Sequence, residues 1–360
     1  MSIEVKAPAN VKISGEHSVV YGGPSLSAAI GIYATAKVED TNSDKLEVVL
    51  QDLNITASFD IPTLRKLYDQ YGKRDVAPPK DPATPTALAK YISENSEVGK
   101  EMLPYATIAA RLLVEHDVNP AGKRVTIHSE VPIQKGYASS AVCSTSFMMA
   151  MVKAAGKVLD DQTAIDIARD GERIVHKAET AGRMDVGPAY YGGYAVFSAA
   201  TGIVSEPISA QIRVVVIDTG PKPPTAEMVK KVRDLYNSDT PGTTKKLREI
   251  DECVTRCIDA LKKGDMNALG EQMSRNHELL RELGVSSDRL DKAVAVAMSN
   301  GALGAKLCGG GGGGMGIALV KNDADAAKVI GRLKEQGFES FETSITLEGA
   351  KNTGKIRNKV

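Results

Sequence analysis

The sequence predicts an α+β protein with two domains. The chain has 360 residues, which exceeds the size that one hydrophobic core usually supports. β-type and helical patterns are mixed along it, and each half ends on a β-type run instead of repeating a strand–helix unit. A β-rich run at residues 212–217 opens the second series of elements. We therefore expect one domain over residues 1–205 and another over residues 206–360.

The first domain should open with a sheet. Short β-type runs bounded by turn residues occupy residues 3–5, 11–14, 32–38, 48–53 and 56–59. A Pro-rich, charged stretch at 73–86 separates two helical patterns and is expected to form a surface insertion. The remaining elements expected in this half are helices at 62–71, 86–92, 105–115, 139–158 and 161–178 and strands at 124–128 and 194–197.

The second domain should be richer in helices. Its expected strands lie at residues 212–217, 316–320 and 340–347. Its expected helices lie at 226–236, 245–263, 266–283, 290–298 and 324–336.

Composition excludes several classes of protein. Lys and Arg number 45, as do Asp and Glu, so nothing attracts the whole chain to nucleic acid or to an anionic membrane. No apolar run approaches the ~20 residues that cross a bilayer, and the first residues lack the apolar core of a signal peptide. Four cysteines without zinc-site spacing indicate reduced thiols. We expect a cytoplasmic protein that binds neither membrane nor nucleic acid.

Six consecutive glycines occupy residues 309–314. Glycine cannot contribute to a core and loses the most entropy on ordering, so such a run indicates a place where backbone closely approaches a ligand or another loop. The run contains GxGxxG, but a dinucleotide fingerprint follows a strand and opens a helix, and here a β-rich run comes after the glycines. A flexible linker would be flanked by polar residues, whereas apolar sequence flanks this one.

A second loop of small residues, at 131–142, joins a strand to a helix that begins near Ser139. The first N–H groups of such a helix are unpaired, and its dipole favours an anion, so the loop can cradle a phosphate. Lys135 adds a positive charge, and the hydroxyls of Ser139 and Ser140 can reach a magnesium ion. A simple helix cap is the alternative. The chain has no Walker P-loop and no protein-kinase signature.

Asp185 lies in a third segment, the Gly-rich stretch 181–188, which we expect to be a non-helical bend before a strand. A carboxylate on rigid backbone suits a general base or a group that orients a hydroxyl. An aspartate that only caps a turn is the alternative.

These segments, together with the motif APANVKISGEHSVVYGG at residues 7–23, resemble the GHMP small-molecule kinases. The family is named for galactokinase, homoserine kinase, mevalonate kinase and phosphomevalonate kinase. The first motif is most similar to the archaeal type of mevalonate kinase. Residues 132–141 match the family's phosphate loop and residues 306–316 its C-terminal glycine motif, so the resemblance covers nearly the whole chain.

The resemblance implies an N-terminal domain like ribosomal protein S5 domain 2, a C-terminal ferredoxin-like domain, and ATP, Mg²⁺ and substrate in the cleft between them. It implies that Asp185 is catalytic, that Ser140 and Glu172 bind the metal, and that Glu179 competes with Glu172 for that role. The residues implied to hold the nucleotide phosphates are Lys135, Gly136, Tyr137, Ala138, Ser139 and Ser140. Those implied to border the substrate are Asn10, Glu16, His17, Gly310 and Gly311. For His17, a structural hydrogen bond is the alternative.

Two positions depart from the family pattern. Mevalonate kinases carry a lysine where this chain has Asn10, and an amide cannot supply a full positive charge. Lys12 would point to the same side of a strand, so we predict that it takes over the catalytic role of that lysine. Residues 134–138 read QKGYA where a glycine-rich pattern is usual. The extra bulk and charge suggest a shifted nucleotide or a substrate that already bears a phosphate.

The resemblance therefore implies an ATP-dependent kinase for a hydroxyl of mevalonate or of a phosphorylated mevalonate, such as mevalonate 3-phosphate, in isoprenoid biosynthesis. Two alternatives stay open. Diphosphomevalonate decarboxylases share the fold and a first motif Ala-Pro-x-Asn, which residues 7–10 copy, although the continuation differs. A ligand-binding homologue that has lost catalysis is the other. The oligomeric state, a homodimer included, is also open.

Overall fold

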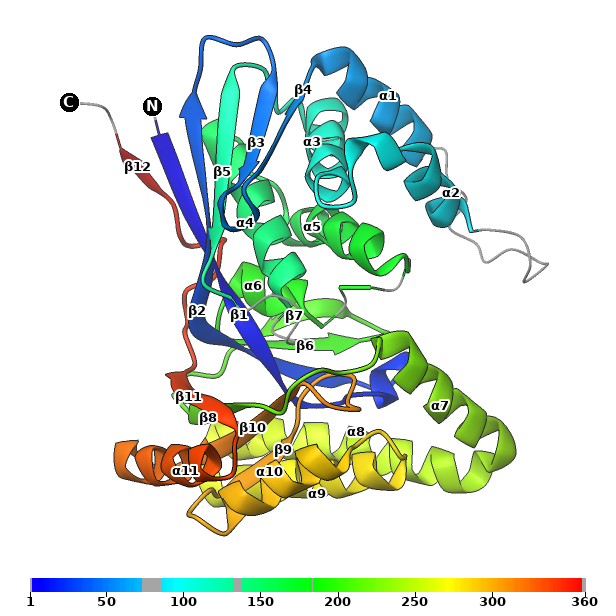
Figure 1. Cartoon of the computed structure of the whole chain (residues 1–360), viewed down its shortest axis with the longest axis vertical. Coiled ribbons are helices and arrows are strands. Elements are labelled where there is room, and N and C mark those ends of the chain that lie inside the picture. The colour runs from blue at the N-terminus through cyan, green and yellow to red at the C-terminus, as the bar shows by residue number, and fades with distance from the viewer. Residues whose placement is uncertain (1, 73–85, 132–137, 180, 183, 358–360) are drawn as a thin grey trace.

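The computed structural model describes residues 2–72, 86–131, 138–179, 181–182 and 184–357 (Figure 1). Residues 355–357 are described by their backbone alone. The expected insertion at 73–86 therefore lies almost wholly outside the described residues. Within them, helices cover two separate β-sheets. In Figure 1 the second sheet lies below the first.

The first sheet has the strand order β12-β1-β2-β5-β3-β4, with β6 and β7 attached through β2. Its strands are β1 (Ser2–Ser14), β2 (Ser25–Asp40), β3 (Leu46–Leu50), β4 (Ile55–Phe59), β5 (Lys123–Ser129), β6 (Tyr194–Ser198), β7 (Gly202–Glu206) and β12 (Lys355–Arg357). β3 and β5 pair in parallel, and the other pairs are antiparallel.

The second sheet consists of β8 (Arg213–Asp218), β9 (Gly304–Leu307), β10 (Met315–Val320) and β11 (Glu339–Ser344). Its order is β11-β8-β10-β9, and all pairs are antiparallel. Counted along the chain, this is the order 4-1-3-2 of a ferredoxin-like fold. The α+β class and the ferredoxin-like second domain are confirmed.

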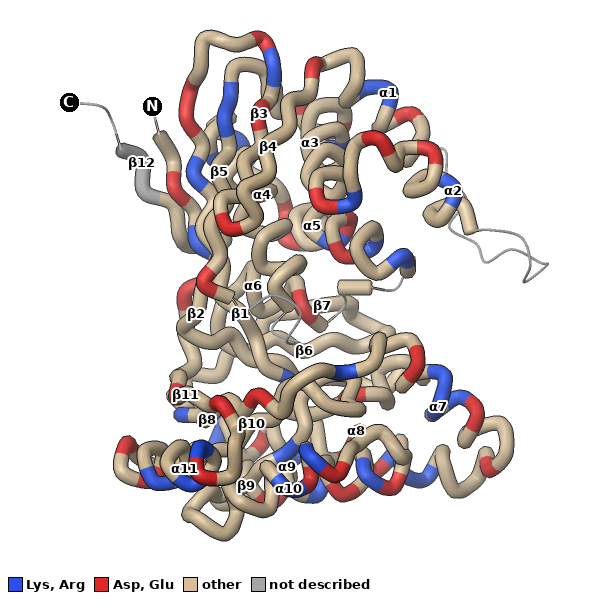
Figure 2. The backbone as a smooth tube through the Cα atoms, in the orientation of Figure 1, with Lys and Arg blue, Asp and Glu red and all other residues tan. Residues whose placement is uncertain are grey.

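The helices of the first half are α1 (Ile61–Gly72), α2 (Ala87–Glu94), α3 (Leu103–His116), α4 (Ser139–Ala154), α5 (Asp161–His176) and α6 (Val186–Tyr191). Those of the second half are α7 (Thr225–Ser238), α8 (Thr240–Lys263), α9 (Met266–Glu282), α10 (Asp288–Met298) and α11 (Asp323–Glu335). Lys, Arg, Asp and Glu are interspersed along α7, α8 and α11 (Figure 2). Within the described part of the chain, no helix combines the length and apolar character that a bilayer span requires.

Helix α4 is the central helix of the first half, because it packs on β1 and β2 on one side and on α3 and α5 on the other. All of residues 141–152 are buried, as expected for a helix that is covered all round. A Cβ on Gly171 of α5 would lie 1.9 Å from the hydroxyl of Ser144, so this glycine lets the two helices approach closely. The start of α4 and the middle of α5 are thereby held in a fixed relation.

The expectation of short runs at 3–5, 11–14 and 32–38 is wrong, because β1 and β2 are long continuous strands. In the structure the β1–β2 register shifts between Pro8 and Ala9, and a bulge tolerates a residue that lacks an N–H. Strands β7, β9 and β12 were not predicted. The helix expected to reach residue 158 ends at Ala154, followed by Gly156 at a φ of 65°.

The end of the chain returns to the first sheet. After β11, strand β12 pairs with β1, with Ile3 opposite Ile356. Lys153 at the end of α4 donates to the backbone oxygens of Ala350 at 3.2 Å and Lys351 at 3.0 Å. The change of sheet falls between β7 and β8, and the division at residues 205 and 206 stays a prediction.

His277 on α9 gives the fold a testable pH dependence. Its Nδ1 accepts a hydrogen bond from the Leu307 N–H at 3.3 Å, and its Nε2 lies 3.3 Å from Asp291 Oδ1. Burial lowers the pKa of His277 to about 4, against about 6.5 in an unfolded chain. The folded protein thus keeps a neutral imidazole at pH values where the unfolded chain takes up a proton.

The free energy of unfolding should therefore fall as the pH drops from about 6.5 to about 4, with His277 contributing up to about 3 kcal/mol of that loss. Urea unfolding of the wild type and of His277→Gln across this range measures the contribution, because other groups titrate in both proteins. The wild type should lose stability relative to the variant at low pH. Parallel curves would show that His277 does not carry the dependence.

Candidate active site

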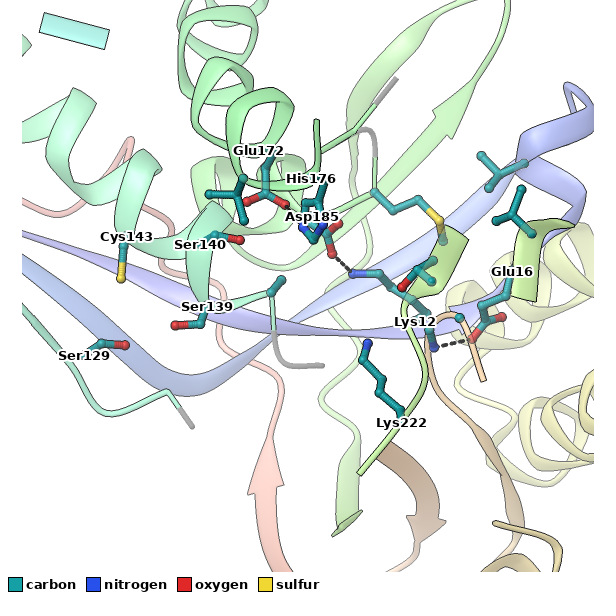
Figure 3. Close-up of a pocket in the computed structure, with 18 of the residues that line it drawn as sticks. Lys12, Glu16, Ser129, Ser139, Ser140, Cys143, Glu172, His176, Asp185 and Lys222 are labelled. Atoms are coloured by element: carbon teal, nitrogen blue, oxygen red, sulfur yellow. Dashed lines mark hydrogen bonds and ion pairs between the residues drawn. The ribbon is translucent and has the colours of Figure 1, made fainter. Parts of the chain in front are cut away.

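A cavity of about 540 Å³ is lined by residues of both halves of the chain. β1, the start of α4 and α5 line it from the first half, through Lys12, Ser139 and Glu172. The segment before α7 and the glycine run line it from the second half, through Lys222 and Gly310. Figure 3 shows side chains from these elements converging on one space. The cavity therefore brings together all three segments that the sequence singled out.

Lys12, Asp185 and Asn10 form a bonded cluster at this cavity. The Lys12 ammonium forms an ion pair with Asp185 and donates a hydrogen bond to Asn10 Oδ1. Asn10 Nδ2 in turn donates to the backbone oxygen of Asp185 at 2.9 Å. The side chains of Asn10 and Lys12 therefore reach the same neighbour, as their spacing on a strand predicted. Asn10 itself does not line the cavity and contacts it through the other two residues.

The side chain of Asp185 is 27% exposed. Burial by itself raises the pKa of this carboxyl, but the Lys12 ammonium, helped by the charges of His176 and Lys222, outweighs burial and holds the pKa below its usual value. Asp185 is therefore a carboxylate at neutral pH.

The expected non-helical bend around Asp185 is partly wrong, because α6 begins at Val186 directly after it. Pro188 falls in the first turn of α6, where a missing N–H costs nothing. Gly187 is required by packing, since a Cβ there would lie 2.2 Å from the Ile203 side chain. Asp185 occupies the N-cap position but makes no capping hydrogen bond with its side chain, so the carboxylate is left to the cavity and to Lys12.

Glu172 and Ser140 offer oxygen atoms to the same space (Figure 3). Glu172 is 1% exposed, and its Oε1 has no hydrogen-bond partner among the described residues. Its Oε2 lies 3.5 Å from His176 Nε2, and this hydrogen-bonding contact raises the pKa of His176. A buried carboxylate oxygen without a partner, beside a hydroxyl, suits a hard cation such as Mg²⁺.

Glu179, the competing candidate for the metal, does not line the cavity. It lies close to Arg173, whose Nε is 4.0 Å from its Oε2. Within the described residues, no group of three or more His, Cys, Asp and Glu side chains could hold a metal ion.

The start of α4 also faces the cavity, through Ala138, Ser139 and Ser140. Ala138 is the N-cap, in a left-handed conformation with a φ of 58°, and the structure shows no side-chain capping hydrogen bond at this N-cap among the residues that it describes. The simple-cap interpretation stays a prediction, since the preceding residues 132–137 are not described. Unpaired amides at a 16-residue helix favour an anion. The predicted Lys135, Gly136 and Tyr137 lie outside the described residues.

Glu16 and His17 connect β1 to the glycine run. Lys306 of β9 forms an ion pair with Glu16 Oε1. Glu16 Oε2 is buried and has no hydrogen-bond partner in the part of the chain that the structure describes, and Glu16 lines the cavity. Burial lowers the pKa of His17, so its neutral ring can donate from Nε2 to the Gly310 oxygen at 3.0 Å. This is the structural hydrogen bond that the sequence left as the alternative role for His17.

The two glycines assigned to the substrate differ in position. Gly310 lines the cavity, but Gly311 does not. A Cβ on Gly311 would lie 2.0 Å from the Val285 oxygen, and Gly312 N donates to that oxygen at 2.7 Å. Gly311 therefore allows two loops to pack closely. The sequence had left open whether the glycine run approaches a ligand or another loop, and at Gly311 it approaches another loop.

Sequence reasoning missed Lys306, His176 and Lys222. Lys306 is the charged residue in an otherwise apolar run at 302–308, and this contrast was an available signal. His176 follows Glu172 by four residues on one helix, which places both on one face. Nothing in the segment Pro221–Pro224 distinguished Lys222 from a surface lysine.

Comparison with known proteins agrees with this fold. The family model described as "GHMP kinases N terminal domain" matches residues 104–193, and "GHMP kinases C terminal" matches residues 257–339. The chain belongs to the GHMP kinase family and is a phosphotransferase that acts on an alcohol.

Within that family it is similar to the mevalonate kinase of Pyrococcus furiosus, with 29% identity over 98% of both chains. A solved structure of mevalonate kinase superposes with a TM-score of 0.76 at 22% identity, covering 96% of this chain and 99% of the other. The phosphomevalonate kinase of Streptococcus pneumoniae has the same fold, with a TM-score of 0.68 at 16% identity over 96% and 100% of the two chains.

Proposed function

We propose that this protein transfers the terminal phosphoryl group of ATP to a hydroxyl group of mevalonate or of a phosphorylated mevalonate. The carrying observation is that Asp185, paired with Lys12, lines the same cavity as the start of α4. The archaeal mevalonate kinases that match almost the full chain support the choice of acceptor.

In this mechanism the α4 amides bind the polyphosphate. Asp185 orients the acceptor hydroxyl and takes its proton as the new P–O bond forms. Glu172 and Ser140 would hold Mg²⁺, which neutralises charge on the phosphates. Glu16 Oε2 is a buried acceptor available to a substrate hydroxyl. Positioning and charge neutralisation supply most of the rate of such transfers.

We assign the apolar part of the cavity to the adenine base. Leu50 of β3 lies opposite Ile127 of β5, and both line the cavity together with Leu53. Leu53 is 44% exposed, and a planar base would cover it. Ser129, two residues after Ile127, lies with Cys143 to the left of Ser139 in Figure 3, whereas Glu16 lies to the right.

Lys12 takes the role of the lysine that mevalonate kinases carry at the position of Asn10. Its ammonium already reaches Asp185, which is where a cation must lie to stabilise a developing alkoxide beside that carboxylate. Asn10 holds Lys12 and the Asp185 backbone in place. An intact cluster of this kind is not expected in a homologue that has lost catalysis.

One coupled assay of ADP release tests the function. The acceptors are mevalonate, its 3- and 5-phosphates, galactose and homoserine, each with ATP and Mg²⁺. Release should be fast with one member of the mevalonate series, should produce no carbon dioxide and should stop with EDTA. If none of the mevalonate compounds led to ADP release, the proposal would be contradicted. Release of carbon dioxide would favour the decarboxylase alternative. Cytoplasmic location and a homodimer stay proposals, and size-exclusion chromatography with light scattering tests the second.

A further inference from the structure

Lys222 lies in a loop that rests on the glycine run. The loop joins β8 to α7 and reads Gly-Pro-Lys-Pro-Pro over residues 220–224, and its prolines restrict the backbone on both sides of the lysine. Thr219 N donates to the Gly314 oxygen at 2.8 Å, and Gly314 N donates to the Gly220 oxygen at 3.1 Å. The loop is therefore bonded to the glycine run at its first residues.

The glycines are needed for this contact. A Cβ on Gly312 would lie 2.6 Å from Pro223, one on Gly313 would lie 2.5 Å from the Pro221 oxygen, and one on Gly314 would lie 2.9 Å from the Lys222 Cδ. Any larger residue would push the loop away. Gly312, Gly313 and Gly314 thus allow the loop that carries Lys222 to pack against the glycine run.

The Lys222 side chain reaches into the cavity. It lines the cavity together with Thr225, and Figure 3 shows it extending from the second domain toward the space between Ser139 and Asp185. Its charge lowers the pKa of Asp185 and opposes the rise in the pKa of His176. The charge of Lys222 is therefore felt both by the Asp185 carboxylate and by His176, the residue that contacts Glu172.

Lys222 has no acidic partner among the described residues, and this distinguishes it from Lys12. The Lys12 charge is already balanced by Asp185. A polyphosphate at the start of α4 brings several negative charges into a partly enclosed site, where an unpaired ammonium is worth more than in water. The second domain thus contributes a cation that forms no ion pair with any described residue.

We infer that Lys222 binds the transferring phosphoryl group and stabilises its charge in the transition state. The inference rests on the proposed function. The acceptor oxygen forms a bond to the γ-phosphorus, and the bond from that phosphorus to the β,γ-bridging oxygen breaks. ADP leaves with that electron pair, and the hydroxyl proton goes to Asp185. Negative charge on the transferring oxygens faces the α4 amides on one side and the Lys222 ammonium on the other.

The Lys222→Met variant should lower kcat by roughly 10²-fold and change the KM for the acceptor little. Lys222→Arg should recover part of the rate, because it restores the charge. Lys230→Met is the matched control, since Lys230 is an exposed residue of α7 paired with Asp234, and its kcat should equal that of the wild type. A raised acceptor KM with unchanged kcat would show that Lys222 holds an anionic group of the acceptor instead, which overturns the inference.

A binding measurement separates this inference from the proposed function. Calorimetry with ADP and with a non-hydrolysable ATP analogue, both with Mg²⁺, needs no acceptor. Lys222→Met should weaken binding of the analogue about tenfold and leave ADP binding unchanged, because only the analogue carries a γ-phosphate. Equal losses for both nucleotides, or no loss for either, would overturn the role of Lys222. Failure of all acceptors in the ADP assay, with selective loss of analogue binding, would instead refute the acceptor class alone.

Discussion

Replacing Asp185 with Asn should lower kcat by roughly 10²- to 10⁴-fold, the range over which a positioned acid or base accelerates proton transfer. The variant keeps the size of the side chain but removes the charge that orients the hydroxyl and receives its proton. Nucleotide affinity should change little, because the phosphates are assigned to α4 and not to this carboxylate. Steady-state kinetics and nucleotide titration of the same preparation measure both. A kcat within threefold of the wild type would exclude Asp185 from the reaction.

Lys12→Met is the companion variant and has a different signature. Without the Lys12 ammonium, burial should raise the pKa of Asp185, since burial and the lysine act in opposite directions on this group. The acid limb of the pH dependence of kcat/KM should then move to higher pH, in addition to a lower kcat. Lys37→Met is the control, because Lys37 is a surface residue paired with Glu39. An unchanged turnover in Lys12→Met would remove the role assigned to Lys12.

Replacing Lys306 with Met should lower the free energy of unfolding by about 3–5 kcal/mol, the usual cost of removing one partner of a buried ion pair. Lys306 is 0% exposed and Glu16 is 2% exposed. The ammonium donates to the Glu16 carboxylate, to the Lys12 oxygen at 3.2 Å and to the Leu307 oxygen at 2.7 Å. Its loss leaves a buried carboxylate without compensation. Urea unfolding followed by circular dichroism measures the change.

The double variant Glu16→Gln/Lys306→Met supplies the control for this effect. It carries no buried charge at the pair, so it should be more stable than Lys306→Met alone, although it still lacks the lysine's hydrogen bonds to two carbonyl groups. Equal stability of the single and double variants would show that the loss comes from packing and not from the unpaired carboxylate. Since Lys306 belongs to β9 and Glu16 follows β1, this pair also joins the second sheet to the first.

Most elements could be predicted from the sequence because their patterns are local. The periodic apolar positions of α8 and α9 and the alternation in β5 identify these elements without knowledge of their neighbours. The family motifs likewise identified Asp185, Ser140 and Glu172 as members of one site, and the structure brings all three to one cavity. Errors occurred where a local signal had a distant cause. Gly187 suggested a bend, but it is a glycine because Ile203 packs against it.

The sequence by itself determined the fold class, the family and the chemical types of the candidate site, because residue spacing and composition encode them directly. Only the tertiary structure decided which charges are already paired. The sequence does not distinguish the charge states of Lys12, Lys306 and Lys222. In the structure Lys12 is paired with Asp185, and Lys306 is buried in an ion pair with Glu16. Lys222 extends into the cavity and has no acidic partner among the described residues. The free energy of a charge depends on its burial and its neighbours, and for these three lysines the decisive neighbours are up to 290 residues away in the chain.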